Sequence, residues 1–269
     1  MKKVAFIGAG SMAEAIISGM VAKQYLPSEQ IYVTNRSNQE RLNELKNKYQ
    51  ISVSLDTKVV LEDADAIILA MKPKQIEVAM AELKPYINPE QLLISVLAGV
   101  TTETIEKQVT FDAPVVRVMP NTSAMIGQSA TTIAAGKYAS ADQVNQVTTL
   151  LESIGTTTVV KEDELHITTA IAGSGPAYFY HMVEAMENAA IKAGLDQRTS
   201  KQLIVQTITG AAAMLKSTTD EPAELIDKIT SPGGTTEAGL NVLKQNQFQE
   251  IVEACVNRAA ERSVEMGKE

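Results

Sequence analysis

The strongest constraint on the fold is a short segment at the start of the chain, where an apolar run leads into a glycine-rich turn and a helical pattern. Residues 4–7 (Val-Ala-Phe-Ile) are long enough for a buried parallel strand. Residues 8–13 follow as Gly-Ala-Gly-Ser-Met-Ala, and apolar residues then recur at helical spacing. Gly8 permits a tight turn, Gly10 lets a phosphate approach the backbone, and Ala13 lets the helix pack on the strand. This order predicts a dinucleotide site; a tight turn without a ligand is the alternative.

The composition is that of a soluble protein with one large domain or two ordinary ones. The chain has 269 residues, of which 45% are hydrophobic and 21% charged, and its net charge is −8. An acidic balance argues against a nucleic-acid or anionic-membrane partner. One cysteine allows no internal disulfide, and two histidines are too few for a zinc site, so we expect no metal. No apolar run reaches the length of a membrane span, and the first residues read as a core strand rather than a signal peptide, so we expect a cytoplasmic protein.

Strands and helices alternate over the first 161 residues. Alternation of this kind is typical of a doubly wound α/β sheet, and we assign residues 1–161 to a Rossmann domain. Helices are expected at residues 38–48, 101–109 (with Thr102 as the cap) and 141–153. Strands are expected at residues 4–7, 31–33, 53, 66–70, 92–96 and 114–119, and two more at 130–135 and 157–160.

The end of the second expected strand indicates which dinucleotide is bound. NAD-binding units carry an Asp or Glu there, which takes the ribose hydroxyls. Here the residues are Asn35, Arg36 and Ser37. Because Arg36 attracts a 2′-phosphate that a carboxylate would repel, we predict a preference for NADPH over NADH. The alternative is that Arg36 is a solvated loop charge.

Two further strand ends carry candidate cofactor contacts. The carboxyl ends of parallel strands face the ligand crevice. Residues 66–70 run into Met71, Lys72 and Pro73, and Lys72 is either a cofactor contact or a surface charge. The sixth strand breaks in a similar way, at residues 119–121 (Met-Pro-Asn).

The remaining residues, 162–269, read as an all-helical domain. Helices apolar nearly all round, such as residues 185–193 and 208–215, must be buried on several sides. A helical half of this size without a sheet would leave apolar surface exposed, so we predict that it packs against a copy of itself. The expected helices are residues 165–172, 176–193, 200–216, 222–230, 237–245 and 248–266.

Two glycine-rich segments interrupt the helical half. Residues 173–176 (Gly-Ser-Gly-Pro) are interpreted as a hinge between helices. Residues 231–236 (Ser-Pro-Gly-Gly-Thr-Thr) precede a helix, and backbone N–H groups with two hydroxyls make an anion cradle there. A carboxylate fits this cradle as well as a phosphate does. A well-capped helix without a ligand is the alternative.

Taken together, the motifs resemble the pyrroline-5-carboxylate reductase family over essentially the whole chain. Three of these motifs, at residues 117–122, 173–178 and 231–236, are specific to that family when they occur in this order and at this separation. The motifs are residues 6–13 (Phe-Ile-Gly-Ala-Gly-Ser-Met-Ala), 69–73 (Leu-Ala-Met-Lys-Pro), 117–122 (Arg-Val-Met-Pro-Asn-Thr), 173–178 (Gly-Ser-Gly-Pro-Ala-Tyr) and 231–236.

The resemblance implies NAD(P)H-dependent reduction of 1-pyrroline-5-carboxylate to L-proline, the last step of proline biosynthesis. It implies a helical domain that interlocks with its twin, in dimers that can assemble further, commonly into a decamer. By the resemblance, Ser231, Gly233, Gly234, Thr235 and Thr236 form the substrate site, and Thr236 lies near the imine nitrogen. The cofactor residues that it implies are Gly8, Gly10, Ser11, Met12, Asn35, Arg36, Ser37, Met71, Lys72, Pro73, Met119, Pro120 and Asn121. Some members also carry an asparagine cofactor contact near Asp56 and Thr57, which this chain lacks.

Reduction of an imine needs little acid–base machinery. Because the motifs contain no His or Cys, positioning and one hydrogen bond must carry the reaction, and we assign the catalytic donor role to Thr236. Two other functions stay open. A hydroxyacid dehydrogenase of similar organisation would use a lysine of the helical half as the acid, and Lys192 and Lys201 are available. A non-catalytic NADPH-binding dimer would need no second ligand site.

Overall fold

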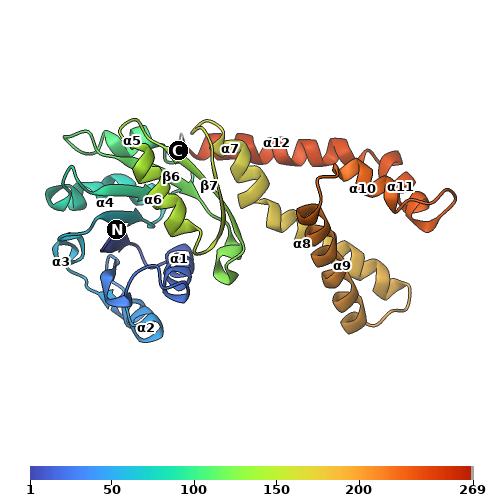
Figure 1. Cartoon of the computed structure of the whole chain (residues 1–269), viewed down its shortest axis with the longest axis horizontal. Coiled ribbons are helices and arrows are strands. Elements are labelled where there is room, and N and C mark those ends of the chain that lie inside the picture. Colours follow the sequence, from blue (N-terminus) through green and yellow to red (C-terminus); the bar gives the residue numbers. More distant parts are fainter. Residues whose placement is uncertain (268–269) are drawn as a thin grey trace. The chain divides into compact units, whose positions relative to one another are not determined.

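The chain forms two compact units in a computed structural model that describes residues 1–267 (Figure 1). Unit 1 is Met1–Ser174 together with the end of the chain from Arg258, and unit 2 is Gly175–Asn257. Residues 162–174 therefore belong to the compact unit that contains the sheet. The domain boundary expected after residue 161 stays a prediction.

Unit 1 is built on one eight-stranded sheet in the order β3-β2-β1-β4-β5-β6-β7-β8. The first six strands have the strand order of a Rossmann fold. All neighbours are parallel except β6 and β7, which pair antiparallel. The strands are β1 (Val4–Ile7), β2 (Ile31–Thr34), β3 (Ser52–Val53), β4 (Ala66–Leu69), β5 (Leu92–Ser95), β6 (Val115–Met119), β7 (Ser129–Ala135) and β8 (Gly155–Val159). Every expected strand is present, and no strand end differs from the expected one by more than two residues.

The central strands are apolar on both faces because both faces are covered. Val4 and Phe6 of β1 belong to one core cluster, whereas Ala5 and Ile7 belong to another, as the two-residue period of a strand requires. The first cluster contains residues of α1 (Ser11–Ala22), α2 (Gln39–Tyr49) and α6 (Ala141–Leu151). The second contains residues of α3 (Thr57–Leu61), α4 (Ile76–Leu83) and α5 (Thr102–Glu106). The sheet is thus doubly wound, as predicted.

The start of α5 corrects one sequence prediction. Thr101, and not Thr102, is the cap, because the Thr101 hydroxyl accepts the Thr104 N–H at 3.1 Å. Thr102 is instead held by Glu162: its N–H and its hydroxyl donate to the two carboxylate oxygens at 2.7 Å and 2.6 Å. Glu162 therefore fastens the start of α5 to the segment that follows β8.

Glu162 also faces a charge buried in the sheet. Arg117, in the middle of β6, is fully buried, and its Nη1 lies 3.4 Å from Glu162 Oε1. Burial lowers the pKa of Arg117, and the Glu162 charge opposes that effect. Among the described residues the Arg117 Nε and Nη2 atoms have no hydrogen-bond partner. Glu162 is thus the carboxylate that compensates this buried guanidinium.

We expect Glu162→Gln to lower the free energy of unfolding by about 1–3 kcal/mol. Removing one partner of a buried ion pair leaves an uncompensated charge, which destabilises the fold. The expected loss of stability is smaller here than for a fully buried pair, because the Glu162 side chain is 28% exposed. Urea denaturation measures this. The control is Glu103→Gln, which breaks an exposed ion pair with Lys107 and should leave stability unchanged. Equal stability of Glu162→Gln and wild type would contradict the assignment.

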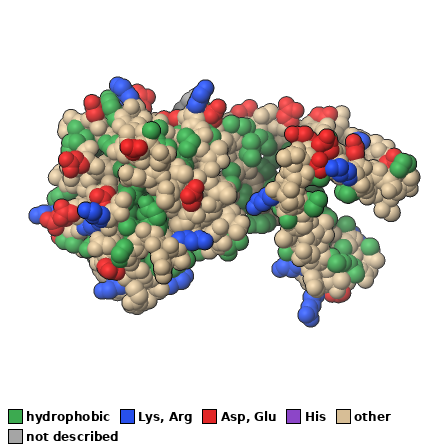
Figure 2. Space-filling model, in the orientation of Figure 1, with side chains coloured by type: hydrophobic (Ala, Val, Ile, Leu, Met, Phe, Trp, Pro, Cys, Tyr) green, Lys and Arg blue, Asp and Glu red, His purple; other side chains and the backbone are tan. Residues whose placement is uncertain are grey.

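Unit 2 is helical, and its apolar residues are largely exposed in the single chain. Within residues 175–257, all of which the structure describes, Ile204 is the one buried hydrophobic residue. Phe179 and Tyr180 are each 65% exposed and Ile229 is 70% exposed. Figure 2 shows hydrophobic side chains on the surface of these helices. The helices are α8 (Gly175–Lys192), α9 (Gln197–Ser217), α10 (Pro222–Lys228), α11 (Thr235–Gln245) and the first part of α12 (Phe248–Met266).

The segment between the sheet and α8 is also helical. It consists of α7 (Leu165–Thr168) and a π-helical turn at Thr169–Gly173. No strand occurs after β8 in the part of the chain that the structure describes, as predicted. A search of the described helices for a membrane span finds none that is both long and apolar enough.

Candidate active site

The glycine turn between β1 and α1 has the geometry of an anion site. Gly8 has φ +117°, and a Cβ there would lie 2.4 Å from the Ala70 carbonyl oxygen, so the turn needs glycine. A Cβ on Gly10 would meet no atom within 4 Å. The N–H groups of Gly10, Ser11 and Met12 donate to no other described residue. Several N–H donors at a helix N-terminus, next to open space, suit a phosphate.

The loop after β2 is shaped by Asn35. Its Oδ1 accepts the N–H groups of Ser37 and Asn38 at 3.1 Å and 2.7 Å, and its Nδ2 donates to the Asn38 carbonyl at 2.8 Å. Arg36 and Ser37 are exposed, and neither side chain bonds to another residue in the described range. The loop therefore presents a free guanidinium and a free hydroxyl, while Asn35 mainly holds the backbone.

The strand register brings these segments to one edge of the sheet. Ile7 is level with Thr34 of β2 and with Leu69 of β4, so Gly8, Asn35 and Ala70 follow at the same height. Lys72 follows Ala70 by two residues and is exposed, and its ammonium bonds to no other described residue. Met71 and Pro73 flank it and are half-buried.

The end of β6 is more enclosed than the other strand ends. Met119 and Asn121 are each 8% exposed, and Pro120 between them is also buried. The Asn121 side chain accepts the Ser123 N–H at 3.0 Å and donates to the Ala172 carbonyl at 2.9 Å. Its amide is engaged within the protein, so a role of Asn121 in the site would be to shape the loop. The role of residues 119–121 at the nicotinamide stays a prediction.

In unit 2, the cradle at residues 231–236 leads into α11. Gly233 has φ +72°, its N–H donates to Glu237 Oε2 at 2.8 Å, and the Gly234 N–H donates to the Ser231 carbonyl at 2.9 Å. The Thr235 and Thr236 N–H groups donate to no residue in the described part of the chain. Of the four N–H donors expected for an anion, those of Gly233 and Gly234 are thus engaged within the loop, and those of Thr235 and Thr236 are open.

Sequence reasoning missed several residues that build these sites. Glu237 stands three residues after the cap Gly234, which is a capping-box spacing and could have been found. Asp56 caps α3 by accepting the Lys58 N–H at 2.9 Å, which gives it a structural role. Within residues 1–267, His, Cys, Asp and Glu form no group of three that could hold a metal ion.

The sheet order, the open glycine turn and the basic loop after β2 define a Rossmann-type dinucleotide-binding oxidoreductase. Residues 3–99 match the family described as NADP oxidoreductase, coenzyme F420-dependent. Residues 162–266 match the family described as pyrroline-5-carboxylate reductase dimerisation. This second match agrees with the prediction that the helical half packs against a copy of itself.

Full-length relatives carry the assignment further. Pyrroline-5-carboxylate reductase 1 of Bacillus subtilis is 50% identical over 268 residues, which cover 100% of this chain and 90% of that protein. A solved pyrroline-5-carboxylate reductase from Coxiella burnetii is similar with a TM-score of 0.92 at 35% identity, covering 100% of this chain and 99% of that one. A Plasmodium falciparum pyrroline carboxylate reductase with NADP bound has a TM-score of 0.88 at 30% identity, covering 99% and 98%. The chain belongs to the pyrroline-5-carboxylate reductase family.

Proposed function

We propose that the chain reduces 1-pyrroline-5-carboxylate to L-proline with NADPH, the last step of proline biosynthesis. The observation that carries this is the pair of open N–H groups at Thr235 and Thr236, in a chain 50% identical to a reductase of that name. These donors, at the positive end of α11, bind the substrate carboxylate.

The reaction adds a hydride to the imine carbon and a proton to the imine nitrogen. NADPH, when bound, would supply the hydride and become NADP⁺. Thr236 donates a hydrogen bond from its hydroxyl to the nitrogen, which makes the carbon more electrophilic, and the proton comes from water through that hydroxyl. The substrate carboxylate is held by Thr235 and Thr236, so that the ring has one orientation.

The residues that would hold the cofactor lie at one edge of the sheet, at the ends of β1, β2 and β4. The N–H groups of Gly10, Ser11 and Met12 would hold the pyrophosphate of the cofactor, and Arg36 and Ser37 would hold its 2′-phosphate. Lys72 adds positive charge beside the crevice. The P. falciparum relative with NADP bound supports NADP as the dinucleotide, and NADPH is the preferred form because Arg36 replaces the usual carboxylate.

We expect Arg36→Ala to raise the KM for NADPH about 10- to 100-fold and to leave the KM for NADH unchanged. Hydrogen bonds to charged groups are worth about 1.5–3 kcal/mol, and a tenfold change in affinity corresponds to about 1.4 kcal/mol. Steady-state kinetics with both cofactors measure the ratio. Arg36→Lys, which keeps the charge, should lose less. A wild-type ratio in Arg36→Ala would remove Arg36 from the site.

The protein acts as a homodimer through its helical part, and such dimers assemble further into a decamer. The apolar side chains exposed on unit 2, such as Phe179 and Ile229, support burial in an interface. We assign the boundary between the two functional parts to residues 161 and 162, and we place the protein in the cytoplasm.

A hydroxyacid dehydrogenase and a non-catalytic NADPH-binding dimer are less well supported, since a family match over residues 162–266 favours the reductase. A panel of 2- and 3-hydroxy acids with NADP⁺ distinguishes the dehydrogenase from the reductase, whereas NADPH binding without turnover of the imine would identify the non-catalytic dimer. We expect no turnover with the panel, and turnover there without activity on the imine would favour the dehydrogenase.

A further inference from the structure

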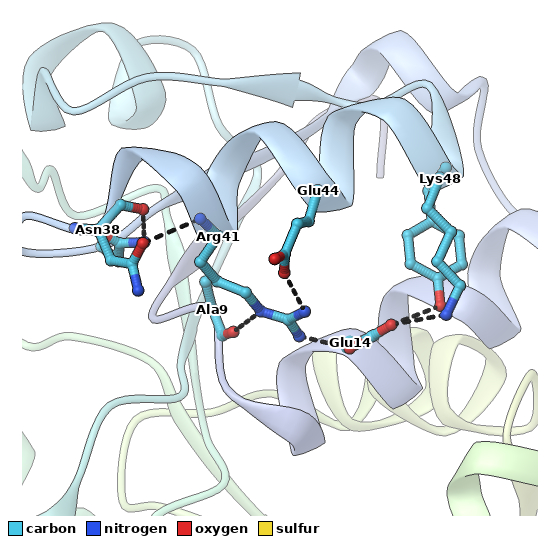
Figure 3. A network of polar contacts seen from close by, with 8 residues as sticks. Ala9, Glu14, Asn38, Arg41, Glu44 and Lys48 are labelled. Carbon is cyan, nitrogen blue, oxygen red and sulfur yellow. Dashed lines mark hydrogen bonds and ion pairs between the residues drawn. The ribbon is translucent and has the colours of Figure 1, made fainter.

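Arg41, a residue of α2 that none of the expected sites includes, contacts the glycine turn directly (Figure 3). Its Nε donates to the Ala9 carbonyl oxygen at 2.9 Å. Its Nη2 forms an ion pair with Glu14 of α1, and its Nη1 lies 3.2 Å from Glu44 Oε2. The Arg41 side chain is 26% exposed. One planar guanidinium therefore holds the turn before α1 and a carboxylate on α1 at the same time.

Glu14 is the centre of the same network. Its Oε1 accepts from Lys48 Nζ at 2.9 Å and from the Tyr49 hydroxyl at 3.0 Å, and the side chain is 12% exposed. The hydrogen bond from Arg41 has the largest effect on the pKa of Glu14, and together with the hydrogen bond from Lys48 it lowers that pKa to about 2. Glu14 thus stays ionised at neutral pH, and two cations of α2 compensate a negative charge in the first turn of the proposed phosphate-binding helix.

The backbone of Arg41 reaches the second phosphate segment. The Arg41 N–H donates to Asn38 Oδ1 at 2.9 Å, and the Asn38 N–H donates to Asn35 Oδ1 at 2.7 Å. The loop that carries Arg36 is therefore joined to the first turn of α2. Through Arg41, this loop and the turn at Ala9 are connected by short hydrogen bonds.

The contact to the Ala9 carbonyl fixes an N–H donor. In a trans peptide the C=O of Ala9 and the N–H of Gly10 point in opposite directions from one plane. Holding the oxygen therefore aims the Gly10 N–H away from Arg41. That N–H bonds to no other residue within the described chain and is one of the proposed pyrophosphate donors.

We propose that Arg41 is a positioning residue for the dinucleotide, which keeps the turn at residues 8–11 and the loop at residues 35–38 at a fixed spacing before the cofactor binds. The role rests on the proposed function of these two segments. The expected effect of substituting Arg41 differs from that of substituting Arg36. Arg36 contacts only the 2′-phosphate and sets the choice between NADPH and NADH, whereas Arg41 preorganises the site for both.

The test measures the Kd of NADPH and of NADH for the full-length protein, by quenching of cofactor fluorescence without substrate. We expect Arg41→Ala to raise both Kd values about 5- to 20-fold, with their ratio unchanged. The kcat at saturating NADPH should stay near wild type, because Arg41 touches no reacting group. Arg41→Lys should be intermediate, since an ammonium cannot hold Ala9 and Glu14 with one planar fork.

Controls separate this role from a general loss of structure. Lys46 is an exposed cation of the same helix, and its side chain bonds to no other described residue. The Lys46→Ala variant should therefore bind both cofactors as the wild-type protein does. Glu14→Gln keeps the shape but weakens the Arg41 contact, and it should raise both Kd values less than Arg41→Ala does. If Arg41→Ala does not fold, Arg41→Lys and Glu14→Gln still give the test.

Three outcomes would count against specific claims. Wild-type Kd values in Arg41→Ala, or in both Arg41→Lys and Glu14→Gln, would overturn the role of Arg41. A change in the NADPH-to-NADH ratio would overturn it too, because Arg41 would then act on the 2′-phosphate alone. Failure of the wild-type protein to bind either dinucleotide would instead refute the proposed function.

Discussion

Thr236→Val should lower kcat/KM for 1-pyrroline-5-carboxylate by about 10²- to 10⁴-fold, which is the usual contribution of a proton donor in the transition state. Thr236 is the second residue of α11, and its hydroxyl bonds to no other described residue, so it is available to a substrate nitrogen. Valine has nearly the same shape and keeps the backbone N–H that we propose as a donor to the substrate carboxylate. The loss should therefore fall mainly on kcat, while the Kd of NADPH stays unchanged.

Thr236→Ser is the matched control, because it restores the hydroxyl without the methyl group. We expect it to recover most of the activity that valine removes. Stopped-flow measurement of NADPH oxidation at saturating imine separates the chemical step from binding. Full kcat/KM in Thr236→Val would show that the hydroxyl is not the donor.

Gly8→Ala should lower the free energy of unfolding by about 2–6 kcal/mol and abolish dinucleotide binding. The first contribution is the strain of a side chain at φ +117°, which costs about 1–3 kcal/mol. The second is overpacking, since the new Cβ would lie 2.4 Å from the Ala70 oxygen and 2.9 Å from the Met71 nitrogen; such insertions cost about 1–3 kcal/mol. Because the backbone of Ala70 and Met71, just after β4, must shift, the proposed phosphate-binding turn is displaced as well.

Gly10→Ala gives a matched comparison within the same turn. Gly10 has φ −74°, and its Cβ would meet no protein atom within 4 Å, so stability should change little. The affinity for NADPH should still fall, because the methyl group occupies the space that the pyrophosphate approaches. Urea denaturation and cofactor titration of both variants separate the two effects. Wild-type stability of Gly8→Ala would contradict the close approach of the Gly8 turn to the backbone of Ala70.

The sheet could be predicted from the sequence because its signals are local. Runs such as residues 66–69 are apolar throughout, and each is followed by a turn or a proline. The direction of β7 could not be predicted, because residues 129–135 give the same pattern whether the strand pairs parallel or antiparallel. The cap of α5 was misplaced by one residue because adjacent threonines are equivalent until Glu162 selects one of them.

Candidate site residues can be predicted from the sequence only where a motif is contiguous. The turn at Gly8 and Gly10 and the segment at residues 231–236 are such cases; both contain open N–H groups, and their role in binding anions stays a prediction. Arg41 and Glu14 lie 27 positions apart, and spacing in the sequence gives no reason to pair them. The engagement of Asn121 by Ala172 likewise depends on a contact that only the fold supplies, whereas the capping-box spacing of Glu237 can be found in the sequence.

We propose that this chain makes L-proline from the cyclic imine and that NADPH is the reductant. The most direct measurement incubates the purified full-length protein with NADPH and 1-pyrroline-5-carboxylate and quantifies both NADP⁺ and L-proline. We expect the two products to form in equal amounts, and we expect Thr236→Val to slow both to the same extent. Oxidation of NADPH without formation of proline, or no oxidation with a protein that binds NADPH, would contradict it.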